Sequence, residues 1–153
     1  MATVRGRVAV VVSRYNEVVT ARLLEGARRC LKDKGVPEAR VDVIWVPGAF
    51  ELPVAAEAAA ATGRYAAIVA LGCVIRGETA HFTYVAGEAA RGLSNVALAH
   101  RLAVGFGVLT TDTAEQALAR SGGPAGDKGY DAADAALRTA DALHQLDRAA
   151  PRD

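Results

Sequence analysis

The hydrophobic positions of this chain fall into four short continuous runs, separated by longer segments in which apolar residues recur at helical spacing. The runs are rich in Val, Ile and Leu, which is typical of strands buried on both faces. They cover residues 7–13, 41–47, 65–72 and 103–111. Their alternation with segments of helical length predicts an α/β fold, in which a four-stranded parallel sheet lies between two layers of helices.

The segment after the first run carries Val19, Leu23, Ala27 and Leu31, which are spaced by four residues and therefore share one face of a helix. The sequence "KDKG" at 32–35 combines basic residues with a glycine, a common way for a helix to end. This segment is predicted to be the first helix.

The later segments predict four more helices. They are expected from about residue 51, over about residues 80–101, after "TTDTAEQ", and over about residues 131–146. Within "TTDTAEQ", Asp112 and Glu115 have the spacing of a capping box. The glycine-rich "SGGPAGDKG" at 121–129 is predicted to be a flexible connection.

Composition and charge narrow the class of protein. A chain of 153 residues with 52% hydrophobic content predicts one globular domain over residues 1–153, with a core from about 6 to 146. Eighteen basic and seventeen acidic residues leave a formal charge of +1 without long blocks of one sign, so neither nucleic acid nor an anionic membrane is expected as a partner. The apolar run near the N-terminus is too short for a signal peptide, and a cytoplasmic location is expected.

The two cysteines give no sign of a metal site. Cys30 and Cys73 lie far apart in the sequence, and neither belongs to a CxxC pair or a Cys/His ligand pattern. We expect both to be reduced thiols, and we expect no bound metal.

The segments that follow the strands are the candidates for chemistry, because ligands of open parallel sheets bind beyond the carboxyl ends of the strands. The first of these segments, "SRYNE" at 13–17, lacks the glycines of a phosphate-binding loop, and no GxxxxGK[ST] sequence occurs in the chain. The "GFG" at 105–107 lies inside a strand and has no third glycine. These patterns argue against a nucleoside triphosphatase and a dinucleotide-binding protein. A phospho-receiver domain needs clustered acids after the first strand and an acid after the third, which "SRYNE" and "GCVIRG" do not provide.

The second segment is "VPGAFEL" at 46–52. Pro47 and Gly48 predict a tight turn, Phe50 offers a flat apolar face, and Glu51 stands where a helix begins. A carboxylate at that place stabilises the helix through its dipole. Glu51 beside an exposed Phe50 would equally bind hydroxyl groups, and the sequence leaves both interpretations open.

The third segment, "GCVIRGETAHF" at 72–82, combines two glycines with polar residues before a helix. The backbone N–H groups of Gly77, Glu78 and Thr79 would face the space beyond the sheet and suit an anion such as phosphate. The Thr79 hydroxyl would add a donor or cap the helix. His81 in the first turn is suited to proton transfer near neutral pH, although a lone histidine is more often structural.

The remaining charged candidates are less specific. Arg120 and Lys128 bracket the glycine-rich connection and would form a phosphate-binding pair, in which arginine offers a fork of donors and lysine a point charge. The same two cations on a mobile loop would otherwise be solvated charges. Arg76 is expected to be a solvated or interface charge, and His100 and His144 are expected to have no convergent partners.

Five motifs, taken in their order and spacing, resemble the lumazine synthase family. They are "RYN", "WVPGAFELP", "GCVIRGETAHF", "GVLTT" and "GDKG", and the resemblance covers about residues 6–146. It implies a flavodoxin-like α/β/α sandwich with a four-stranded parallel sheet. It also implies an enzyme that condenses 5-amino-6-(ribitylamino)uracil with 3,4-dihydroxy-2-butanone 4-phosphate, releasing phosphate and water to form 6,7-dimethyl-8-ribityllumazine, the penultimate step of riboflavin biosynthesis. No organic cofactor or metal is implied.

The resemblance further implies a role for each matched residue. Tyr15 would stack on the pyrimidine, the segment Ala49, Phe50 and Glu51 would hold the ribityl chain, and Cys73, Val74 and Ile75 would meet the pyrimidine through backbone groups. Gly77, Glu78 and Thr79 would cradle the phosphate, with His81 as proton donor and acceptor. Phe106, Arg120 and Lys128 would come from the neighbouring subunit, where Phe106 and Lys128 would contact the ribitylaminouracil and Arg120 would bind the phosphate.

The family pattern also raises the question of assembly. Members form homopentamers and in some cases hollow capsids of sixty subunits, and riboflavin synthase is a candidate partner. The length of "SGGPAGDKG" favours sixty subunits, whereas a short N-terminus favours a pentamer or decamer. Tyr15 replaces the more usual phenylalanine or tryptophan and still offers a stacking ring, and Cys73 stands where threonine is frequent.

Two rival functions share this fold. One is a non-catalytic module that binds flavins or ribityl compounds, and the other is a structural shell protein. Neither needs His81, Arg120 and Lys128 together, and this chain has all three.

Overall fold

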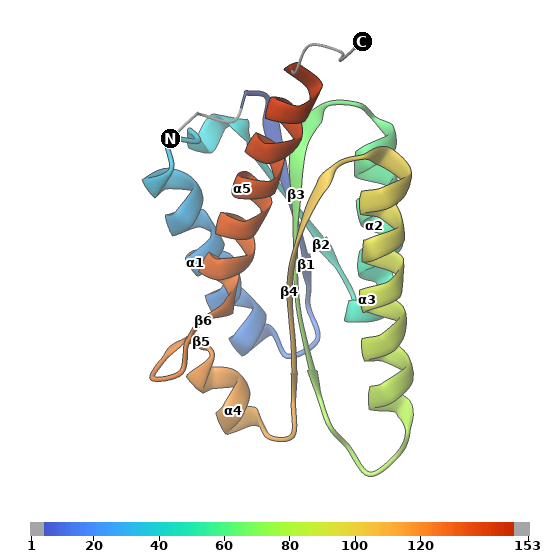
Figure 1. Ribbon diagram of the computed structural model, residues 1–153. Helices are drawn as coiled ribbons and strands as arrows, with labels where there is room; N and C mark the ends of the chain where they lie inside the picture. Colours follow the sequence, from blue (N-terminus) through green and yellow to red (C-terminus); the bar gives the residue numbers. More distant parts are fainter. Residues whose placement is uncertain (1–4, 149–153) are drawn as a thin grey trace.

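Four parallel strands form the central sheet of the computed structural model, which describes residues 5–148 (Figure 1). Their order in space is β2 (Val41–Val46), β1 (Arg7–Ser13), β3 (Tyr65–Ile75) and β4 (Ala103–Thr111). The predicted four-stranded parallel sheet is thus confirmed. Since all four strands run the same way, their carboxyl ends meet at one edge of the sheet, the lower edge in Figure 1.

Helices cover both faces of the sheet and make three layers (Figure 1). One layer contains α1 (Glu17–Asp33), α4 (Ala114–Ala119) and α5 (Lys128–Arg148), and the other contains α2 (Leu52–Ala61) and α3 (His81–His100). Two short 3₁₀ turns, η1 (Glu38–Arg40) and η2 (Ala49–Glu51), flank β2. The three-layer α/β/α arrangement agrees with a flavodoxin-like fold, as expected.

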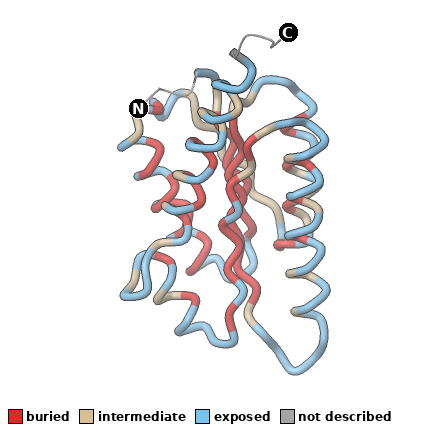
Figure 2. The backbone as a smooth tube through the Cα atoms, viewed as in Figure 1, coloured by how far each residue is buried: buried red, intermediate tan, exposed pale blue. Residues whose placement is uncertain are grey.

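The hydrophobic core lies on both sides of β1 and β3, the two central strands (Figure 2). Along β3, Val69 and Leu71 pack toward α1 and α5, whereas Ile68 and Ala70 pack toward α2 and α3. The expected burial on both faces is wrong for β2, in which every residue is partly exposed because the strand lies at an edge. It is also incomplete for the other edge strand, β4, where Phe106 is exposed.

Helix α1 follows its predicted pattern. All four residues of its apolar stripe are buried. The helix ends as "KDKG" predicts: Gly35 has a φ of +86°, and the N–H groups of Gly35 and Val36 bond the carbonyls of Lys32 and Leu31 at 3.1 and 2.9 Å. A residue without a side chain is favoured at that positive φ.

Two element boundaries differ from the predictions. Strand β3 continues three residues further, because Cys73, Val74 and Ile75 pair with the end of β4 and so belong to the sheet rather than to a turn. Helix α4 is capped by Thr113 and Gln116, which form the reciprocal capping box, so the predicted box of Asp112 and Glu115 is wrong by one position.

The prediction of a flexible connection over residues 121–129 is also wrong. Strands β5 (Ser121–Gly123) and β6 (Gly126–Asp127) pair there as a small antiparallel hairpin. Helix α5 begins at Lys128, three residues earlier than predicted, because the Asp127 carboxylate accepts a hydrogen bond from the Tyr130 N–H at 3.1 Å and caps the helix.

Close contact between α2 and α3 depends on a glycine. A Cβ at Gly92 would lie 2.6 Å from the Pro53 ring, whereas a Cβ at Gly87 on the same helix would meet nothing within 4 Å. Gly92→Ala is expected to lower the free energy of unfolding by about 1–3 kcal/mol through overpacking. Gly87→Ala should raise it by up to about 1 kcal/mol, because alanine is the better helix former. Urea denaturation of both variants at one protein concentration tests the pair, and equal stabilisation by both would contradict the α2–α3 contact.

Candidate active site

The segment after β1 is bonded to the turn after β2 at the carboxyl edge of the sheet. The Arg14 N–H donates to the Val46 carbonyl at 2.8 Å, and the Tyr15 N–H donates to the Pro47 carbonyl at 2.9 Å. The Tyr15 ring then lies over Gly48, where a Cβ would be only 2.7 Å from the ring. Glycine at this position therefore allows an exposed aromatic ring to lie directly beside the turn that leads into Glu51.

Glu51 has the helix-start role that the sequence left as one of two interpretations. Its Oε1 accepts a hydrogen bond from the Gly48 N–H at 2.9 Å, closing the turn before α2. Among the described residues, its second carboxylate oxygen has no hydrogen-bond partner. Phe50 beside it is 57% exposed, and Ala49 is buried beneath it. Capping thus leaves one acceptor oxygen available for a ligand.

Asn16 is a residue of this edge that sequence reasoning missed. Its φ of +64° lies in the left-handed region, which asparagine tolerates better than most residues. Its side-chain amide donates to the Cys73 carbonyl at 3.0 Å and so joins the loop after β1 to the end of β3. An asparagine just before a helix was the available sign, but its partner is 57 positions away in the sequence.

The end of β3 presents backbone rather than reactive side chains. Cys73 and Val74 are buried, and Ile75 is partly buried. Burial raises the pKa of the Cys73 thiol to about 11, so this group stays protonated near neutral pH. Cys73 is therefore not equipped to act as a nucleophile.

Arg76 is exposed, in agreement with its prediction as a solvated or interface charge, and it also holds the loop that follows β3. Its N–H donates to the Thr111 carbonyl at 2.8 Å, and its Nε donates to Asp112 Oδ1 at 2.8 Å. Its guanidinium lies 4.5 Å from the centre of the Phe82 ring. These contacts join the end of β4, the loop and the first turn of α3.

The three residues that were predicted to bind an anion lie on this loop. Gly77, Glu78 and Thr79 are all exposed, and the position of a Cβ on Gly77 has nothing within 4 Å. Thr79 Oγ1 accepts from the His81 N–H at 3.4 Å, at the limit of a hydrogen bond. His81 is the first residue of α3, and its exposed ring has no bonded partner among the described residues.

Arg120 and Lys128 form a second group. The Lys128 N–H donates to the Arg120 carbonyl at 2.8 Å. The two residues therefore have neighbouring backbone positions at the base of the β5–β6 hairpin, and both are exposed. This hairpin lies in the α1–α5 layer, across the sheet from the start of α3 (Figure 1). Phe106 lies midway along β4 and is 39% exposed. Among the described residues, no hydrogen bond or ion pair joins any of these three residues to His81.

The other histidines lie away from both groups. His100 Nε2 and Glu57 Oε2 are 2.6 Å apart and link α3 to α2, so the expectation of no partner is wrong for His100. His144 is exposed on α5, and no bonded partner for it is found among the described residues.

Three further features of the described residues bear on the site. A hollow of about 600 Å³ lies between the end of α1 and the start of β2, at the opposite edge of the sheet, and contains none of the candidate residues. Over the residues that the structure describes, no three His, Cys, Asp or Glu side chains cluster as metal ligands do. No helix within residues 5–148 is long and apolar enough to cross a membrane.

The fold and this edge define an α/β protein of the kind that binds a small ligand beyond its strands, with a histidine beside an exposed loop of free N–H groups. Comparison with known families agrees with this class and narrows it. Residues 5–144 match the family described as 6,7-dimethyl-8-ribityllumazine synthase. Because the match covers nearly the whole chain, the protein belongs to this family of riboflavin-biosynthesis enzymes.

Proposed function

We propose that this protein condenses 5-amino-6-(ribitylamino)uracil with 3,4-dihydroxy-2-butanone 4-phosphate to form 6,7-dimethyl-8-ribityllumazine. The observation that carries the proposal is that three matched motifs, those of Tyr15, Glu51 and His81, follow strands at the same edge of the sheet. Family membership supports the same assignment.

The pyrimidine substrate would occupy the space beside Tyr15. The Tyr15 ring offers a stacking surface, and the free carboxylate oxygen of Glu51 would accept hydrogen bonds from ribityl hydroxyls. Backbone groups from Cys73 to Ile75 would meet the edge of the pyrimidine. Ala49 and Phe50 would enclose the ribityl chain.

The phosphorylated substrate would lie over the loop of Gly77, Glu78 and Thr79. The free N–H groups before α3 favour a phosphate, both as donors and through the helix dipole. The 5-amino group of the pyrimidine attacks the ketone, and water leaves as the imine forms. Phosphate then leaves by elimination, and the ribitylamino nitrogen attacks the carbonyl group that results, closing the ring with loss of a second water. His81 would take and return the protons of these steps, while orientation of the two substrates lowers most of the barrier.

A second subunit would complete the site. Arg120 and Lys128 stand at the base of a hairpin in the α1–α5 layer, across the sheet from the start of α3 (Figure 1). We propose at least a homopentamer, in which one subunit contributes Tyr15, Glu51 and His81 and its neighbour contributes Phe106, Arg120 and Lys128. Head-to-tail contacts of this kind form a closed ring when the rotation between neighbours divides the full turn. For the final assembly, we propose a capsid of sixty subunits rather than a pentamer or decamer.

The activity is tested by mixing the purified protein with both substrates and following the fluorescent lumazine product together with released phosphate. Product should form well above the rate of the uncatalysed reaction, and omission of either substrate should abolish it. Binding of a ribityl-pyrimidine analogue without any acceleration would identify a non-catalytic binding module instead and would overturn the proposal.

A further inference from the structure

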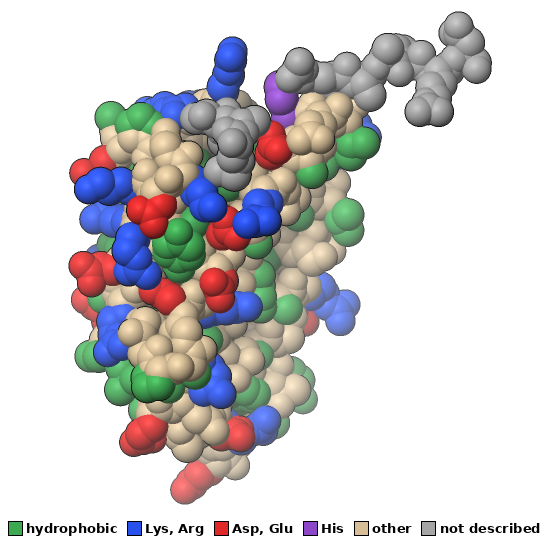
Figure 3. Space-filling view, turned by 60° about the vertical axis from the view of Figure 1, so that its left-hand side comes forward, with side chains coloured by type: hydrophobic (Ala, Val, Ile, Leu, Met, Phe, Trp, Pro, Cys, Tyr) green, Lys and Arg blue, Asp and Glu red, His purple; other side chains and the backbone are tan. Residues whose placement is uncertain are grey.

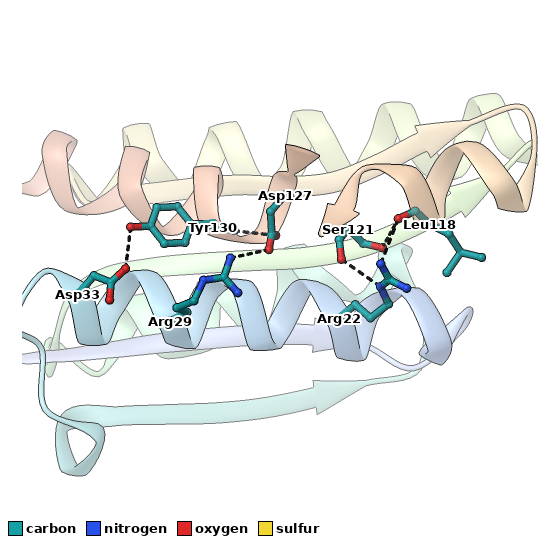
Figure 4. A network of polar contacts seen from close by, with 7 residues as sticks. All are labelled: Arg22, Arg29, Asp33, Leu118, Ser121, Asp127 and Tyr130. Atoms are coloured by element: carbon teal, nitrogen blue, oxygen red, sulfur yellow. Dashed lines mark hydrogen bonds and ion pairs between the residues drawn. The ribbon is translucent and has the colours of Figure 1, made fainter. Parts of the chain in front are cut away.

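One face of α1 contacts the hairpin that carries Arg120 and Lys128. Arg22, Gly26, Arg29 and Asp33 are spaced by four, three and four residues and therefore lie along one stripe of the helix. Each meets a residue between positions 118 and 130. Figure 4 shows the polar members of this stripe pointing across to the hairpin and to the start of α5.

Arg22 bonds the backbone on both sides of Arg120. Its Nε donates to the Ser121 carbonyl at 3.1 Å, and its Nη2 donates to the Leu118 carbonyl at 3.5 Å (Figure 4). Bonds from a guanidinium to carbonyl oxygens are charge-assisted. Because Ser121 is 2% exposed, the bond at its carbonyl is sheltered from water, and the backbone around Arg120 is held against α1.

Gly26 and Arg29 hold the residue before Lys128. A Cβ at Gly26 would lie 2.3 Å from Asp127 Oδ1, so only glycine admits this carboxylate to the helix surface. Asp127 accepts from Arg29 Nη2 at 3.0 Å and from the Tyr130 N–H at 3.1 Å. The start of α5 is therefore fixed to α1 by a capped and paired carboxylate.

The stripe continues through Tyr130. Its hydroxyl donates to Asp33 Oδ2 at 3.0 Å, and the Arg29 guanidinium lies 5.3 Å from the centre of its ring. The hydrogen bond to Asp33, with some burial, raises the pKa of the Tyr130 hydroxyl, so it remains a donor. On the face shown in Figure 3, acidic and basic side chains are intermixed, as such pairing requires.

We infer that Arg22 and Gly26 are positioning residues for Arg120 and Lys128. The stripe fixes the base of the hairpin, and the 2.8 Å bond between Lys128 N–H and Arg120 carbonyl joins the two cations. Both are then presented, already oriented, to the site of the neighbouring subunit, where Arg120 would bind the phosphate. This inference rests on the proposed function, and it assigns α1 of one chain to the site of the next.

Steady-state kinetics provide the first test. Arg22→Ala should raise the KM for the phosphorylated substrate about 10-fold, because a displaced Arg120 guanidinium binds the phosphate less well. The KM for the pyrimidine should change less than about twofold. Gly26→Ala should also raise the KM for the phosphorylated substrate, because displacement of Asp127 moves the hairpin base that carries Arg120. Arg28→Ala, on the same helix but outside the stripe, should behave as wild type. An unchanged KM for the phosphorylated substrate in both stripe variants, or equal changes of both KM values in Arg22→Ala, would overturn the inference.

Mixed assemblies provide the deciding test. Arg22→Ala co-assembled with His81→Ala should regain about a quarter of wild-type sites, because some sites combine the intact His81 of one chain with the intact Arg22 and Arg120 of its neighbour. Arg22→Ala co-assembled with Arg120→Ala should regain none, because both defects fall on the same side of every site. Mass spectrometry would verify that the chains mix.

The reverse pattern, with recovery only in the Arg22 and Arg120 mixture, would show that Arg22 serves its own chain's site and would overturn the inference alone. A control mixture of His81→Ala and Arg120→Ala tests the shared site separately from the role of Arg22. If that control shows no recovery, the shared site itself is wrong, and the proposed arrangement falls together with the role of Arg22.

Discussion

Replacement of Arg120 by alanine is expected to raise the KM for the phosphorylated butanone about 10- to 100-fold. A hydrogen bond between a guanidinium and a phosphate contributes about 1.5–3 kcal/mol, and each 1.4 kcal/mol corresponds to about tenfold in affinity. The KM for the ribitylaminouracil should change little, because that substrate carries no phosphate. Initial rates measured with each substrate varied in turn give both constants.

Two further variants serve as comparisons for Arg120→Ala. Arg120→Lys keeps the charge but loses the planar fork of donors, so it should restore only part of the affinity. Arg138→Ala removes an exposed arginine that pairs with Asp134 on α5 and should leave both constants unchanged. If Arg120→Ala weakened both substrates equally, Arg120 would have a general structural role, and its assignment to the phosphate would be wrong.

His81→Ala is expected to lower kcat about 100-fold while binding of a ribityl-pyrimidine analogue stays near the wild-type level. General acid and base catalysis contributes about 10²–10⁴-fold, and a condensation that proceeds without an enzyme lies at the low end of that range. Single-turnover formation of the lumazine measures the chemical step, and equilibrium titration with the analogue measures binding.

The matched control for His81 is His144→Ala, which removes an exposed histidine from α5. It should leave kcat and binding unchanged. A wild-type kcat in the His81 variant would remove this residue from the mechanism, and the proton transfers would then belong to substrate groups or water.

Several features of the fold were predictable because they depend on local sequence. The bounds of β1 and β4, the buried stripe of α1 and its glycine end agree with the structure. Hydrophobic periodicity and terminal capping act over a few residues, so they can be recognised without the tertiary structure. Where a local pattern offered two neighbouring solutions, as at the start of α4, the choice of Thr113 over Asp112 was not predictable, because Asp112 is occupied by Arg76.

The candidate site likewise has features that the sequence predicted and features that depend on the tertiary structure. The sequence by itself determined that Tyr15, Glu51 and His81 follow strands. Because the strands were predicted to be parallel, it also determined that these three segments lie at one edge of the sheet. Tertiary structure alone decided which side chains meet there. Asn16 bonds Cys73 across 57 positions, and Arg29 bonds Asp127 across 98. Such pairs have no periodic or spacing signature in the chain, because each depends on packing between whole layers rather than on neighbouring residues.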